Sequence, residues 1–115
     1  MPSWLLTPAQ AWMVLIVAGA FEIVWALGLK QSQGFSRLVP SLVVIVAAAI
    51  SFWLLAIAMR VLPVGTAYAV WTGIGAAGTA VLGIAWLGEP ATAIRLLCIG
   101  LIVAGVLGLR FAGSS

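Results

Sequence analysis

One stretch limits what this chain can fold into more than any other: residues 11–29 are nineteen apolar or small residues interrupted by a single carboxylate, Glu22. A helix of this length spans about 28 Å and just crosses the ~30 Å hydrocarbon core of a bilayer. A carboxylate near the middle costs at least ~2.5 kcal/mol to insert, so it is normally paired, protonated or exposed to a water-filled cavity. We therefore expect a transmembrane helix in which Glu22 is functional. The alternative is a structural glutamate hydrogen-bonded inside a helix bundle.

The composition assigns the rest of the chain to the membrane as well. Of its 115 residues, 65% are hydrophobic and 6% are charged, whereas soluble domains carry about 25% charged residues. The basic residues stand singly, as interfacial anchors do, and Trp4 and Trp12 fit an interfacial aromatic belt. The net charge of +3 therefore indicates no nucleic-acid partner. Without His and with a single Cys, the chain predicts no metal cluster, no internal disulfide and no cofactor.

Polar tracts and helix breakers divide the chain into four apolar segments. A polar run covers residues 30–37, Leu62-Pro63 ends the second segment, and Gly88-Glu89-Pro90 ends the third. The short connections leave no room for a soluble domain, so any site must lie within the membrane. The sequence thus predicts an all-α membrane protein with one domain, residues 1–115, and transmembrane helices at about 11–29, 38–59, 64–87 and 92–109.

The basic residues also bear on orientation and assembly. They balance across the predicted membrane, with Lys30, Arg37 and Arg95 on one side and Arg60, Arg110 and the N-terminal amine on the other. A chain without a positive-inside bias can insert in both orientations. One copy offers a single membrane carboxylate and little interior volume. We therefore expect an antiparallel, dual-topology homodimer in which two Glu22 side chains face one cavity.

The neighbours of Glu22 suggest what the carboxylate binds. Residues three and four positions away share its helical face. Ala18, Gly19 and Ala26 leave space there, and Trp25 places an indole beside the carboxylate. An anionic group in a roomy pocket flanked by an aromatic ring suits a cation.

The third segment combines aromatic residues with glycines. Tyr68 and Trp71 are three positions apart and share a face. Gly73, Gly75 and Gly78 follow, and each weakens a helix by about 1 kcal/mol relative to Ala. We expect these glycines to mark either a bend or a close backbone approach.

Five stretches carry a resemblance to a known family. They are GAFEIVW at 19–25, LKQSQGF at 29–35, SFW at 51–53, PVGTAYAVWTGIGA at 63–76 and GEP at 88–90. With these residues the chain resembles the small multidrug resistance transporters, and within them the guanidinium-exporter branch. The resemblance covers nearly the whole chain. It implies an antiparallel, dual-topology homodimer in the bacterial plasma (inner) membrane that is a transporter and not an enzyme.

The resemblance also implies residue roles. The glutamate that binds both substrate and proton falls on Glu22, and the serine that supports it on Ser51. Tyr68 is expected to donate a hydrogen bond to Glu22, unless it is only an interfacial belt residue. The remaining roles fall on Trp25 and Trp71 in the substrate pocket, Gly73 and Gly75 at a kink of the third helix, and Cys98 and Gly105 in dimer packing. In the multidrug branch, two glycines occupy the positions of that last pair.

The activity implied is proton-coupled antiport. Guanidinium and small substituted guanidinium ions, guanylurea included, would be exported in exchange for about two protons, one for each Glu22 of the dimer. Within the family, the alternative is a multidrug exporter of quaternary ammonium cations. Outside the family, the alternatives are an ion channel and a small assembly or regulatory membrane subunit.

Overall fold

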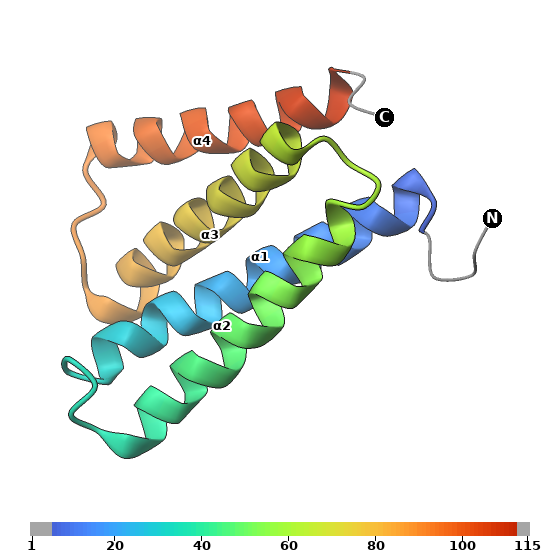
Figure 1. Cartoon of the computed structure of the whole chain (residues 1–115). Coiled ribbons are helices and arrows are strands. Elements are labelled where there is room, and N and C mark those ends of the chain that lie inside the picture. The colour runs from blue at the N-terminus through green and yellow to red at the C-terminus, as the bar shows by residue number, and fades with distance from the viewer. Residues whose placement is uncertain (1–5, 113–115) are drawn as a thin grey trace.

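The computed structural model describes residues 6–112, which form four helices. These are α1 (Pro8–Gln31), α2 (Leu38–Ala58), α3 (Val64–Leu87) and α4 (Ala93–Phe111) (Figure 1). All four are long and apolar enough to cross a membrane, and the described residues contain no strand. The prediction of an all-α fold with four membrane-spanning helices is confirmed. Trp4 lies outside the described residues.

Capping residues explain why α1 and α4 differ from the expected bounds. Thr7 caps α1 through a capping box: its hydroxyl accepts from the Gln10 N–H at 3.2 Å, and the Gln10 side chain accepts from the Thr7 N–H at 3.0 Å. Pro8 suits the first helical turn, so α1 begins three residues before the expected residue 11. Thr92 caps α4 from outside the helix by accepting from the Arg95 N–H at 3.3 Å.

The helix α1 is the centre of the arrangement. It packs against α2 on one side and α3 on the other, whereas α4 packs mainly against α3 (Figure 1). A core of mostly apolar side chains joins the first three helices toward the end where the N-terminus lies. Its buried members are Ala11, Trp12, Leu15, Ala18, Leu55, Ala58, Leu62, Ala67, Val70 and Trp71.

Trp12 lies inside this core and not in an aromatic belt facing lipid. Its side chain is only 6% exposed. The guanidinium carbon of Arg110, near the end of α4, lies 5.2 Å from the centre of its ring, within the range of a cation–π contact. The belt interpretation of Trp12 is therefore wrong.

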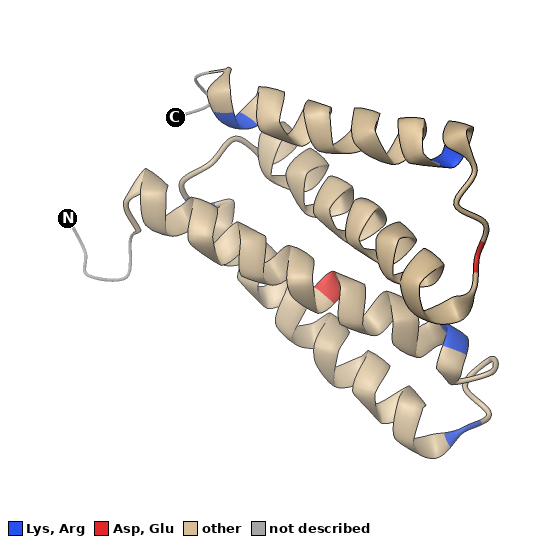
Figure 2. Ribbon diagram, turned by 180° about the vertical axis from the view of Figure 1, so that it is seen from behind, with Lys and Arg blue, Asp and Glu red and all other residues tan. Residues whose placement is uncertain are grey.

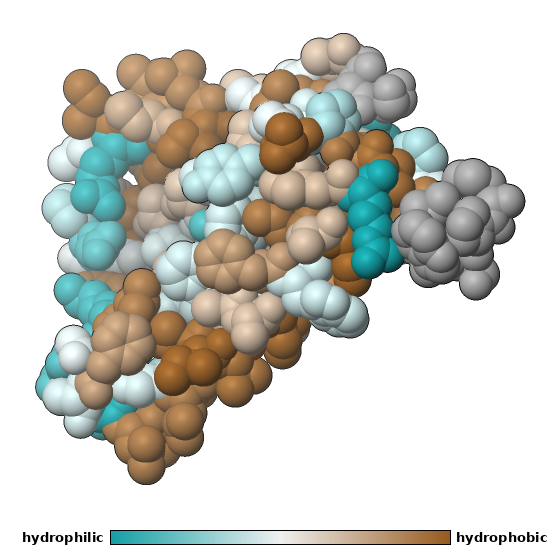
Figure 3. Space-filling view, viewed as in Figure 1, coloured by the Kyte–Doolittle hydropathy of each residue, from teal (hydrophilic) through white to brown (hydrophobic). Residues whose placement is uncertain are grey.

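The outer surface is apolar. Figure 3 shows hydrophobic residues over much of α2 and α4, and large exposed side chains such as Leu42, Ile45 and Leu101 contribute to it. The Lys and Arg residues lie at or near the helix ends, whereas one of the two acidic residues lies within α1 (Figure 2). Exposed apolar surface between charged ends is the pattern expected of helices that face lipid.

The α3 glycines allow close helix packing. A Cβ added to Gly75 would overlap the Glu22 carboxyl group, and one added to Gly78 would overlap Ile23, also in α1. On another side of α3, a Cβ at Gly73 would overlap Val106 of α4. Of the two alternatives for these glycines, close approach is confirmed. The helix is continuous from Val64 to Leu87, and a kink at Gly73 and Gly75 stays a prediction.

Candidate functional site

Glu22 lies on the face of α1 that packs against α3. Its carboxyl group lies against Gly75, where the missing side chain makes room for it. The side chain is partly buried, and Oε1 is shielded from solvent without a hydrogen-bond partner in the described part of the chain. An unpaired buried acceptor costs free energy until a donor or a cation satisfies it. The carboxylate is therefore available to bind one.

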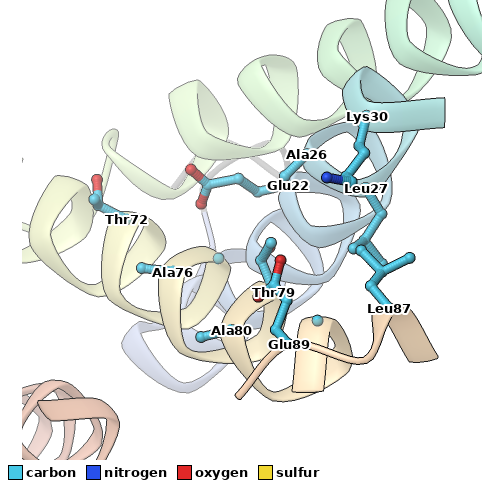
Figure 4. A pocket seen from close by; sticks show the side chains of 12 residues that line it. Glu22, Ala26, Leu27, Lys30, Thr72, Ala76, Thr79, Ala80, Leu87 and Glu89 are labelled. Carbon is cyan, nitrogen blue, oxygen red and sulfur yellow. The ribbon is translucent and has the colours of Figure 1, made fainter. Parts of the chain in front are cut away.

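A cavity of about 380 Å³ between α1 and α3 opens beside Glu22. Most of its lining is apolar or glycine, and its polar side chains come from both helices and from the α3–α4 connection (Figure 4). Those polar residues are Glu22, Lys30, Thr72, Thr79 and Glu89. Such a volume accommodates a small planar ion together with several waters.

A row of aromatic rings connects α1, α2 and α3. Trp25 stacks on Phe52 with ring centres 6.3 Å apart. Phe52 lies 5.1 Å from Trp71, which lies 5.6 Å from Tyr68. The structure thus places Trp25, Tyr68 and Trp71 in one row, in which Phe52 joins Trp25 to the other two rings. These three residues and Ser51 do not line the cavity of about 380 Å³, and their place in a substrate pocket stays a prediction.

Ser51 links the same three helices with hydrogen bonds. It is fully buried, its hydroxyl donates to the Ala18 carbonyl at 2.7 Å, and it accepts from the Trp71 indole N–H at 2.9 Å. Ala18 lies one turn before Glu22 in α1. Ser51 therefore holds the Trp71 ring and the α1 backbone in place, and its support of Glu22 is indirect.

Two polar groups on aromatic side chains, the Trp25 indole N–H and the Tyr68 hydroxyl, have no hydrogen bond to Glu22 within residues 6–112. The indole N–H of Trp25, one turn after Glu22, is buried without a hydrogen-bond partner in residues 6–112. Tyr68 is 55% exposed, and no hydrogen bond joins its hydroxyl to Glu22 within the same residues. The bond from Tyr68 to Glu22 stays a prediction.

Cys98 and Gly105 lie on α4, away from the cavity beside Glu22. Cys98 is exposed, and a Cβ added to Gly105 would meet nothing within 4 Å. No residue of α4 is buried within the single chain. This leaves a large part of the helix surface open to another helix.

The fold and the site together define a small helical membrane protein with a carboxylate inside a membrane-spanning helix. The family model described as Small Multidrug Resistance protein matches residues 10–102, and the chain belongs to this family.

Three curated relatives are each named guanidinium exporter. The one from Yersinia pseudotuberculosis is 61% identical over 103 residues, which are 90% of this chain and 99% of the relative. Those from Salmonella typhimurium and Citrobacter freundii are 58% identical, covering 90% of this chain and 98% of each relative. The family resemblance is confirmed, and with it a multi-pass transporter of the bacterial inner membrane and not an enzyme.

Proposed function

We propose that this protein exports guanidinium and small substituted guanidinium ions, guanylurea among them, in exchange for protons. The observation that carries the proposal is the Glu22 carboxylate, whose Oε1 is buried beside a cavity of about 380 Å³ without a hydrogen-bond partner among residues 6–112. Relatives that share 58–61% of the aligned residues and are named guanidinium exporters support this choice of cation.

Guanidinium fits the chemistry around Glu22. It is planar and presents parallel N–H groups that match the two oxygens of a carboxylate. Its flat face stacks on aromatic rings. Trp25 lies one helical turn from Glu22 in α1 and stacks on Phe52, although neither ring lines the cavity of about 380 Å³. We expect the Trp25 indole to narrow the space beside the carboxylate and so to disfavour bulky multi-ring cations.

Proton coupling follows from competition for one carboxylate. Glu22 cannot hold a proton and form a bidentate salt bridge with guanidinium at once, so a proton entering the site releases the cation. An antiparallel, dual-topology homodimer supplies two Glu22 side chains and about two protons per transported cation. If the empty, unprotonated dimer does not change between its inward-facing and outward-facing states, inward proton flow drives export.

The decisive test is transport by the purified protein in proteoliposomes under a pH gradient. Guanidinium, methylguanidinium and guanylurea should be transported, and a tetraphenylphosphonium-type cation at equal concentration should be transported poorly. Guanidinium binding should weaken as the pH falls, because protons occupy the same carboxylate. A clear preference for the phosphonium ion would assign the protein to the multidrug branch instead, and guanidinium flux without coupled proton movement would indicate a channel.

A further inference from the structure

The second acidic residue of the chain, Glu89, lies against the same row of α3 residues as Glu22. Gly75, Thr79 and Gly83 are four positions apart and therefore line one face of α3. A Cβ added to Gly75 would overlap the carboxyl group of Glu22, and one added to Gly83 would overlap that of Glu89. Eight helical residues rise about 12 Å. The two carboxylates thus lie roughly that far apart along one helix face.

The space between the two carboxylates is part of one cavity. The cavity of about 380 Å³ is lined by Glu22, Thr79 and Glu89 (Figure 4), and Thr79 lies between Gly75 and Gly83, the two glycines that the carboxylates contact. The Thr79 hydroxyl oxygen is shielded from solvent and has no hydrogen-bond partner in the described residues. A donor crossing the cavity would find this acceptor about one helical turn from each carboxylate.

Glu89 already binds a guanidinium group, that of Arg95 at the start of α4. The Nη2 of Arg95 donates to Oε1 of Glu89 at 3.1 Å, and the two side chains are 39% and 37% exposed. The contact uses one nitrogen of the fork, while Nε of Arg95 is buried without a partner in residues 6–112. Exposed ion pairs of this kind contribute only ~0.2–1 kcal/mol. A free guanidinium ion can therefore compete with Arg95 for Glu89.

We propose that Glu89 is a second guanidinium-binding carboxylate, which holds the transported ion at the membrane interface by displacing Arg95 and passes it along Thr79 to Glu22. The proposal rests on the proposed function, since it concerns the route of that substrate. The Arg95 guanidinium acts as a tethered competitor that occupies Glu89 when no substrate is present. Lys30 lines the same cavity and shortens the stay of a cation there by like-charge repulsion.

Transport kinetics test this role through the opposite effects of two substitutions. Glu89→Gln should raise the KM for guanidinium about threefold to fivefold, because the interfacial carboxylate is lost. Arg95→Gln should lower the KM about 1.4-fold to fivefold, the factor that ~0.2–1 kcal/mol of released competition corresponds to. The double variant should behave as Glu89→Gln does. A purely structural ion pair predicts the same direction of change for both single variants, and that result would overturn the proposal.

Two controls separate this role from effects on charge and on the central site. Arg37→Gln removes one positive charge from an exposed residue at the same end of the molecule but outside the cavity, and it should leave the KM unchanged. Guanidinium binding at Glu22, followed by tryptophan fluorescence, should stay within about twofold of wild type in Glu89→Gln. If the wild-type protein itself transports no guanidinium, the proposed function fails before these variants are compared.

Binding at Glu89 is also measurable without transport. In the Glu22→Gln variant, the side-chain ¹⁵N resonance of Arg95 Nε should shift when guanidinium chloride is added, with sodium chloride as the ionic-strength control. The shift should be absent when Glu89→Gln is added to that variant. No shift of Arg95 at guanidinium concentrations tenfold above the transport KM would overturn the proposal.

Discussion

The interface between α1 and α3 and the outer surface of α4 are built in opposite ways. The first brings glycines of α3 against side chains of α1, encloses a cavity and buries polar atoms of Glu22, Trp25 and Thr79. The second belongs to a helix with no buried residue, which packs mainly against α3. One chain therefore assembles the surroundings of its own carboxylate, whereas most of the α4 surface is exposed in the described part of the chain. Substitutions at the α1–α3 interface should therefore affect ion binding, and substitutions on the outer surface of α4 should affect assembly of the dimer.

Replacing the carboxylate should have the largest effect. Glu22→Gln keeps the size of the side chain but cannot form a salt bridge or exchange a proton, so we expect guanidinium transport to fall at least 100-fold while the protein still folds and dimerises. Glu22→Asp should keep some transport with a changed pH optimum. Proteoliposome flux and calorimetric proton release measure both effects. Unchanged guanidinium affinity in Glu22→Gln would place the binding site elsewhere.

Forcing one orientation should inactivate the protein if two opposite copies are needed. Lys at the exposed positions Gln31 and Gln33 adds positive charge to one end, and Lys at Val64 and Ala112 adds it to the other. Because the charge bias sets the orientation, each double variant should be inactive alone, and co-expression of the two should restore export. Resistance of cells to guanidinium measures this. Full activity of either variant by itself would contradict the antiparallel dimer.

Adding a methyl group should distinguish the two regions directly. Gly75→Ala would overlap the Glu22 carboxyl group, and overpacking of this kind costs about 1–3 kcal/mol. We expect guanidinium transport to fall about tenfold or more. Gly65→Ala is the matched control in the same helix, since nothing lies within 4 Å of the added atom, and its flux should equal that of wild type.

The α4 counterpart of this test is Gly105→Ala, where the added methyl group also meets nothing within the chain. Any loss of dimer in detergent, measured by cross-linking or light scattering, would then report contact with a second copy. We expect the dimer to weaken while guanidinium binding per folded dimer is retained. An unaffected dimer would remove Gly105 from the packing surface.

The smallest effect is expected at Ser51. Ser51→Ala removes the hydrogen bonds to the Ala18 carbonyl and from the Trp71 indole, and an unpaired buried donor costs about 1–3 kcal/mol. We expect a lower Tm and a severalfold weaker guanidinium affinity, because Trp71 is no longer held in place. Ser36→Ala is the control, because the hydroxyl of this exposed serine bonds only to carbonyls of Ser32 and Gln33 beside it in the chain, and it should leave the guanidinium affinity unchanged.

Hydrophobic length and helix breakers were sufficient to predict the four helices. An apolar run long enough to cross the bilayer must satisfy its backbone hydrogen bonds internally, so it is a helix whatever its neighbours are. The bounds differ by one to three residues at several ends, because Thr7 and Thr92 cap helices through local hydrogen bonds that hydropathy does not register. The sequence was also sufficient to single out Glu22 as a candidate site, since a membrane carboxylate is costly to keep.

The roles of Phe52, Ser51 and Glu89 depended on the packing of different helices. Phe52 is one of many apolar residues of α2 until its ring is found between Trp25 and Trp71. A membrane serine commonly bonds back to its own helix, whereas Ser51 bonds to α1 and α3. From the sequence, Glu89 and Arg95 are a loop ion pair or two solvated charges, and the structure contains the ion pair. Glu89 lines the cavity of Glu22 only because Gly83 lets it approach α3.

Sequence alone therefore determined the membrane class, the helices and the central carboxylate, because each depends on local hydrophobicity or on the cost of one buried charge. Tertiary structure decided which groups share the cavity with that carboxylate, because such neighbours are set by contacts between residues far apart in the chain.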